Sequence, residues 1–105
     1  MYTRNVAIKL KVNCAPEFTR TLENEVIPVL RKQKGFRDEI TLVAPERNEV
    51  VALSFWDRKE DAEAYGREKY PEILKTLSKV VEGVPKVESF EVANSTSHQI
   101  AARAV

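Results

Sequence analysis

Hydrophobic and polar residues alternate along the first twelve positions of the chain. One set of alternating positions carries Val6, Ile8, Leu10 and Val12, while lysines recur between them. Alternation with a period of two is typical of a β-strand that buries one face and exposes the other. The pattern therefore predicts a strand over residues 3–12.

From residue 16 the hydrophobic spacing changes to three and four, which is typical of an amphipathic helix. The recurring residues are Phe18, Leu22, Val26, Val29 and Leu30. They predict a helix over residues 16–33, which Pro16 can begin because its first turn needs no N–H. Pro28 should kink the last turn or end the regular helix early, and Gly35 suits its C-terminal cap.

Two further strands are predicted over residues 36–44 and 49–56, joined by a turn at residues 45–48. The second of these strands, EVVALSFW, is apolar on both of its faces. A strand of this kind is usually central in a sheet, or has its second face covered by another subunit.

A second helix is predicted to begin after Asp57, which suits the N-cap position with Glu60 three residues later. Its apolar stripe is interrupted by Gly66 and Pro71, so a bend or a short gap is expected near residues 66–71.

Gly83 and Pro85 should close this second helix, and a last strand is predicted from Lys86 to Val92. The tail over residues 94–105 is either disordered or packs as a short helix on a partner chain. One domain is therefore expected over residues 1–93, followed by this tail.

The order of the predicted elements is β-α-β-β-α-β, which is the ferredoxin-like arrangement in the α+β class. Right-handed crossovers place both helices on one face of a four-stranded antiparallel sheet. The doubly apolar strand predicts that the opposite face is buried against a second copy, giving an isologous homodimer.

The composition excludes several classes of protein. Seventeen basic and sixteen acidic residues give a net charge of +1 over 105 residues, which predicts no nucleic-acid partner. No apolar run is long enough to span a bilayer, and the N-terminus has no signal-peptide pattern, so no membrane association is expected. Cys14 is the single cysteine, which excludes an internal disulfide and favours a reducing cytoplasm.

The stretches GFRDEITLVAPERNEVVALSFWDRKEDAEAY and VIPVLRKQKGF resemble the dimeric α+β-barrel superfamily, and within it the antibiotic biosynthesis monooxygenase-type domains. The likeness rests on a Gly-Phe after the first helix, a strand that ends in Trp, and an Asp-Arg-Lys-Glu-Asp helix start. It extends over residues 3–93. It implies a dimeric barrel with a cavity between the sheet and the helices.

The resemblance also implies what such a protein can do. Members include small oxygenases that oxidise quinol-like aromatics without metal or flavin, haem-degrading enzymes, and domains with no assigned activity. The haem-degrading members use an Asn on the first strand, with a Trp and a haem-ligating His on the second helix. Asn5 is suitably placed, but Tyr65 stands where that Trp would be and Lys75 near the His. We therefore expect no cofactor and no metal.

Five residues are candidates for the lining of a substrate pocket: Asn5, Trp56, Tyr65, Tyr70 and His98. Trp56 is also explained as a packing anchor, since its large ring can bury up to about 250 Å². Both tyrosines are also explained as core residues with a solvated hydroxyl, and Asn5 as a turn-facing or edge residue. His98 would suit a general base, but it stands in the polar tail.

Two functions follow from these features. The first is a cofactor-independent monooxygenase that acts on a small aromatic compound, quinol-like or anthrone-like. The second is a non-catalytic dimeric module that binds a small ligand or serves in assembly, because the sequence contains no compelling acid and base pair.

Overall fold

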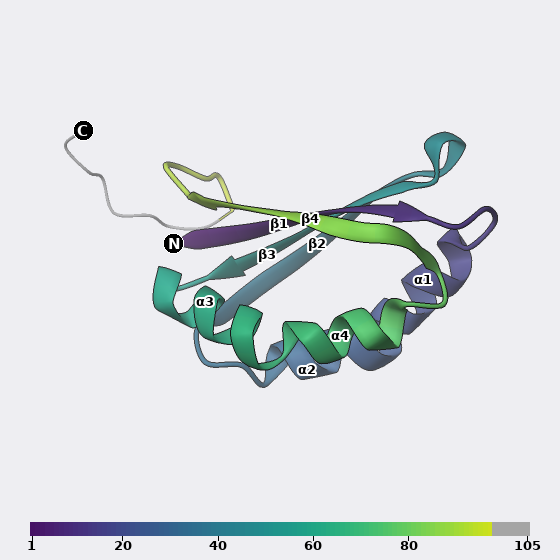
Figure 1. Cartoon of the computed structure of the whole chain (residues 1–105). Helices are drawn as coiled ribbons and strands as arrows, with labels where there is room; N and C mark the ends of the chain where they lie inside the picture. The colour runs from purple at the N-terminus through teal and green to yellow at the C-terminus, as the bar shows by residue number, and fades with distance from the viewer. Residues whose placement is uncertain (98–105) are drawn as a thin grey trace.

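A computed structural model describes residues 1–97 and confirms the predicted β-α-β-β-α-β order (Figure 1). The elements are β1 (Tyr2–Leu10), α1 (Ala15–Thr21), η1 (Leu22–Val26), α2 (Ile27–Arg31), β2 (Phe36–Ala44), η2 (Pro45–Arg47), β3 (Glu49–Trp56), α3 (Lys59–Glu68), α4 (Tyr70–Leu77) and β4 (Val81–Glu91). The bounds of β2 and β3 agree with the predicted strands.

The four strands form one antiparallel sheet in the order β2-β3-β1-β4. The helices cover one face of this sheet, and the other face carries no element of the chain's described part (Figure 1). This is the ferredoxin-like arrangement that the sequence predicts. The strand with two apolar faces, β3, is central and pairs with β2 and β1.

The core lies between the sheet and the helices. Even-numbered residues of β1 and β3 face the helices, because side chains of a strand alternate between its two faces. Trp56 and Phe18 are fully buried there. The other core residues are Val6, Ile8, Leu10, Leu22, Val26, Leu30, Val50, Ala62, Tyr65, Ile73, Leu77 and Val80.

The first helix is interrupted before Pro28 and then resumes through Arg31. Pro28 has no N–H to donate to the carbonyl of Asn24, four residues earlier. The chain adopts a π-turn at this point, in which the Ile27 N–H donates to the Leu22 carbonyl. A wider turn therefore replaces the predicted kink in the last turn, and the helix continues past the proline.

The second helix differs from the prediction at both of its ends. Arg58, and not Asp57, occupies the N-cap position, because the Asp57 carboxylate pairs with Arg37 of β2. Gly83 and Pro85 lie within β4 and do not close the helix, which ends at Leu77. Because β4 is an edge strand, it has room for a proline that donates no ladder hydrogen bond.

The predicted break within the second helix is confirmed at Lys69, between α3 and α4. No helix in residues 1–97 is long and apolar enough to cross a membrane.

The sheet face away from the helices is apolar over β2 and β3. Its apolar side chains are Ile40, Leu42, Val51, Leu53, Phe55 and, on β4, Phe90. Three of them are about half exposed in the single chain: Ile40 at 47%, Leu42 at 52% and Phe90 at 50%. A patch of this kind usually marks a contact surface.

The turn before β2 requires a glycine. Gly35 has a φ of 77°, and a Cβ there would lie 2.1 Å from the Asp61 Oδ2 and 2.8 Å from its Cβ. Gly83 has a similar φ of 74°, but nothing lies within 4 Å of its added Cβ. A substitution at Gly83 therefore adds backbone strain alone, whereas one at Gly35 adds both backbone strain and steric overlap.

We predict that Gly35→Ala lowers the free energy of unfolding by more than Gly83→Ala. Both variants incur the left-handed backbone cost of about 1–2 kcal/mol, and only Gly35→Ala must also displace Asp61. Urea denaturation of the two variants measures the difference. Equal losses would contradict the close approach of α3 to this turn.

Candidate functional site

A small cavity lies between the sheet and the helices. Its volume is about 50 Å³, which is room for about three or four water molecules. One end is apolar, lined by Val6, Ile8, Leu22, Val26, Leu30, Ala52, Ile73 and Leu77, and the other end is polar, lined by Arg4, Glu39, Ser54, Tyr65 and Tyr70. The described part of the chain thus gathers five polar side chains at one end of its core.

Arg4 brings a positive charge into this cavity. It precedes Val6 on the helix-facing side of β1, and only 8% of its surface is exposed. Its guanidinium carbon lies 4.4 Å from the ring centre of Tyr70 and 5.3 Å from that of Tyr65. Cations are attracted to aromatic faces at such distances. Burial lowers the pKa of Arg4, and the two tyrosines oppose this effect.

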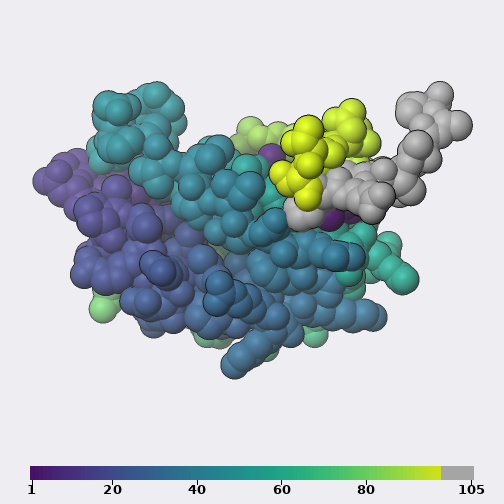
Figure 2. Space-filling model, turned by 180° about the vertical axis from the view of Figure 1, so that it is seen from behind, coloured from purple at the N-terminus to yellow at the C-terminus, as the bar shows by residue number. Residues whose placement is uncertain are grey.

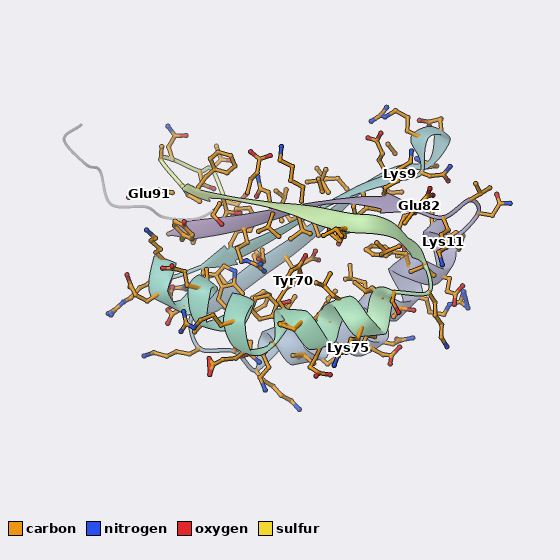
Figure 3. All side chains as sticks on the ribbon, viewed as in Figure 1. Lys9, Lys11, Tyr70, Lys75, Glu82 and Glu91 are labelled. Carbon is orange, nitrogen blue, oxygen red and sulfur yellow. The ribbon has the colours of Figure 1, made fainter. Side chains whose placement is uncertain are left out.

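The two tyrosines reach the cavity from α3 and α4, and Figure 3 shows Tyr70 between the helices and the sheet. Burial raises the pKa of Tyr65 to about 12, although the nearby Arg4 opposes the rise. Burial also raises the pKa of Tyr70, again against the effect of Arg4. Both phenols therefore stay protonated near neutral pH and can donate a hydrogen bond.

Glu39 supplies a carboxylate at the same end of the cavity. It stands opposite Ser54 in the pairing of β2 with β3, so its side chain also faces the helices. Burial raises the pKa of Glu39, which the hydrogen bond from the Thr41 hydroxyl at 2.7 Å opposes. A carboxylate with a raised pKa is a better proton acceptor than an ordinary one.

Arg4 and Glu39 each line a second space outside the cavity. Arg4 also borders a hollow of about 370 Å³ between α3 and the β1–β4 edge, which contains Gly66 and Ser89. Glu39 also borders a hollow of about 520 Å³ between β2 and the first helices. Figure 2 shows the side of the molecule on which those helices and β2 form the surface. Each charged residue thus separates the cavity from an open hollow.

The structure brings together two of the five residues that the sequence suggests as pocket lining. Tyr65 and Tyr70 line the cavity. Trp56 lies beneath Tyr65, with ring centres 5.1 Å apart, and its Nε1–H donates to the Ser54 Oγ at 2.9 Å. Trp56 has no exposed surface and acts as a packing anchor that holds Ser54 in place.

Asn5 does not line this cavity. It lies one residue after Arg4, and the alternation of β1 turns it to the face away from the helices. There its Oδ1 accepts a hydrogen bond from the Thr3 hydroxyl at 3.1 Å. His98 lies outside the described residues.

Arg4, Glu39 and Ser54 are functional candidates that sequence reasoning missed. Arg4 occupies the same alternating face as Val6 and Ile8, and Ser54 the same face as Ala52 and Trp56. A polar residue on a face predicted to be buried is a signal that could have identified both positions.

Two further possibilities are a metal-binding cluster and the single cysteine. No cluster of three His, Cys, Asp or Glu side chains that could hold a metal ion occurs in residues 1–97. Cys14 is half-buried before α1 and packs against the core, which fits a structural thiol.

Comparison with known proteins shows the fold of the chain. No protein-family model and no curated protein matches the sequence. A monooxygenase from Streptomyces coelicolor, ActVA-Orf6, in complex with nanaomycin D matches with a TM-score of 0.75 and 14% identity over 90% of this chain and 88% of that one. The match to a protein of unknown function from Nitrosomonas europaea has a TM-score of 0.75 and 12% identity, over 96% of this chain and 94% of the other.

A further structure is that of a candidate antibiotic biosynthesis monooxygenase from Nitrosomonas europaea. It matches with a TM-score of 0.72 and 17% identity, over 90% of this chain and all of that one (100%). The chain therefore has the fold of the antibiotic biosynthesis monooxygenase-type structures, as the resemblance of its sequence implies.

We predict that ionisation of Tyr65 lowers the free energy of unfolding at alkaline pH. An unfolded tyrosine ionises near 10 and the folded Tyr65 at a pKa of about 12, so the folded state binds more protons between these values. The contribution of Tyr65 to the free energy of unfolding is therefore fully present below pH 10. It is lost as the pH rises toward 12, by about 1.4 kcal/mol per pH unit.

Urea unfolding of the wild type and of Tyr65→Phe between pH 9 and 12 measures this contribution, since the variant lacks the ionising group. The slope should be shallower in Tyr65→Phe. Identical slopes in the two proteins would show that the Tyr65 phenol is not held in its protonated form.

Proposed function

We propose that this protein is a cofactor-independent monooxygenase that acts on a small aromatic compound, quinol-like or anthrone-like. The observation that carries the proposal is the polar end of an otherwise apolar cavity, where Arg4, Glu39, Tyr65 and Tyr70 converge. The fold that the chain shares with a monooxygenase from Streptomyces coelicolor adds support.

The proposed reaction needs a base and a group that stabilises an anion. In an anthrone-like substrate, a base removes a proton from the activated CH₂ carbon, and the resulting enolate is electron-rich enough to reduce O₂. A C–O bond forms at that carbon as a peroxide. Loss of water from the peroxide then leaves a carbonyl, so one oxygen atom enters the product and the other leaves as water with the two hydrogens.

The residues of the cavity suit these roles. Glu39 is the proton acceptor, because burial raises its pKa. Arg4 is the group that stabilises the developing oxyanion, since its buried guanidinium carries a fixed charge. Tyr65 and Tyr70 donate hydrogen bonds to substrate oxygens, and the apolar end accommodates the aromatic carbons.

The second candidate function is that of a non-catalytic dimeric module, which binds a small ligand or serves in assembly. The size of the cavity favours the assembly role, because about 50 Å³ is well below the 300–1,000 Å³ of usual ligand pockets. An oxygenase would have to join the cavity to one of the neighbouring hollows by moving Arg4 or Glu39. A module that serves in assembly would need no such movement.

Both functions include a homodimer formed through the apolar sheet face. Side chains of β2 and β3 cover this face, and Ile40 and Leu42 are about half exposed in the single chain. Packing two such faces together would bury them as in a β-sandwich. The interface would be isologous, because the same face meets itself.

We predict that the protein consumes one O₂ for each hydroquinone or anthrone molecule oxidised, with no added metal or flavin. An oxygen electrode with a panel of such compounds measures this. Glu39→Gln should lower kcat by about 10²–10⁴-fold, the usual contribution of a general base. Glu46→Gln, in an exposed turn, is the matched control and should leave the rate unchanged.

A folded protein that consumes no oxygen with any compound of the panel would refute the oxygenase. It would leave the binding module as the function of the chain.

We predict a sedimentation mass of twice the 12.0 kDa of the single chain at micromolar concentration. Leu42→Asp should halve this mass, because it places a charge on the apolar face. Val12→Asp is the control, since Val12 is also apolar and exposed but lies beyond β1. A wild-type mass near 12.0 kDa would contradict the dimer.

A further inference from the structure

Arg4 is a buried cation without an acidic partner in the described chain. None of the ion pairs in residues 1–97 includes it. Glu39 shares the cavity with Arg4 and Glu63 shares the outer hollow, and neither pairs with it. A buried charge is costly unless an opposite charge or strong acceptors balance it. An anionic ligand would provide such a balance.

The hydroxyl of Tyr70 is a second polar group without a partner. It is buried, and it has no hydrogen-bond partner among the protein atoms of residues 1–97. Its ring lies against the Arg4 guanidinium, and both residues line the same cavity. Two hydrogen-bond donors, one of them charged, therefore meet in one small space.

The dimensions of the two spaces beside Arg4 indicate the shape of a ligand. The cavity of about 50 Å³ has room for a group of about three heavy atoms, such as a carboxylate. The hollow of about 370 Å³ lies in the usual range for small-molecule sites, and Ala62 and Gly66 form an apolar part of its wall. Because Arg4 lines both and separates them, one ligand can occupy both when its charged group draws the guanidinium out of the dividing wall.

We propose that Arg4 and Tyr70 bind the carboxylate of a small aromatic acid, whose ring lies in the hollow between α3 and β4. The inference rests on the proposed function only for the location of the site, and it names the chemical class of its ligand. A carboxylate matches the planar fork of a guanidinium and can also accept a hydrogen bond from a phenol. Among residues 1–97, Arg4 is the one cation of the cavity, which also contains the Glu39 carboxylate. In the hollow Glu63 offsets Arg67, so the charges favour a monoanion over a doubly charged group.

The test compares 2-naphthoate with 2-naphthamide, which has nearly the same shape but no charge. Trp56 is the single tryptophan of the chain, and its Nε1–H contacts Ser54 of the cavity wall, so its ¹⁵N–¹H NMR signal reports on the site. We expect the acid to bind about 10- to 100-fold more tightly than the amide, the range of a charge-assisted hydrogen bond.

Three variants test the individual residues. Arg4→Gln should abolish the preference for the acid. Tyr70→Phe should weaken binding of the acid several-fold without lowering stability, because the oxygen that it removes has no partner. Gly66→Leu should weaken both compounds about tenfold or more, because the new side chain fills the hollow and its Cβ would lie 3.6 Å from the Arg4 guanidinium carbon, while leucine favours the helix more than glycine does.

Arg20→Gln is the matched control for Arg4→Gln, because it removes an exposed arginine of α1 and the same net charge. It should leave both affinities unchanged. Equal affinity of the wild type for acid and amide, or no binding of either at millimolar concentration, would overturn the proposal. An unchanged preference for the acid in the folded Tyr70→Phe and Arg4→Gln variants would overturn it as well.

Oxygen uptake separates this inference from the proposed function. Selective binding of the acid, together with no uptake on any hydroquinone, would support the carboxylate site and contradict the oxygenase. Uptake with a neutral anthrone, together with equal binding of acid and amide, would contradict the carboxylate site and support the oxygenase.

Discussion

The alternation of side chains on the two central strands, β1 and β3, decides which residues form the cavity wall and which form the open face of the sheet. Even-numbered residues of these strands face the helices, and odd-numbered residues face away. Because of this alternation, Arg4 enters the core while Asn5 turns outward, although the two are neighbours in the chain. A shift of one residue in register would exchange the cavity wall with the open face of the sheet.

The apolar open face and the cavity wall thus both follow from this alternation of side chains. On β3, Val51, Leu53 and Phe55 leave an apolar surface on the side away from the helices, while Ser54 and Trp56 point into the core. Trp56 buries its whole ring, and its N–H donates a hydrogen bond to the Ser54 hydroxyl. The same side chain therefore packs the core and pairs its own polar group. The tryptophan therefore orients a wall of the cavity without lining it.

The helical layer adapts to this core at two places. The π-turn before Pro28 lies in the segment that contributes Leu22 and Val26 to the apolar end of the cavity. The break at Lys69 lets Tyr65 and Tyr70 approach Arg4 from two separate helices. Aromatic faces are the available counterparts of this buried charge, and their attraction is weaker than that of a carboxylate, which leaves Arg4 suited to a ligand.

The sequence by itself determined the order of elements, the bounds of β2 and β3, and the break within the second helix. These features follow from local periodicity and from proline and glycine positions, which act over a few residues. Only the tertiary structure decided that Arg4, Glu39 and the two tyrosines share one cavity, since they come from four different elements, two strands and two helices. It also decided that Asp57 pairs with Arg37 and that Gly83 lies in a strand, because contacts between elements outweigh local preference there.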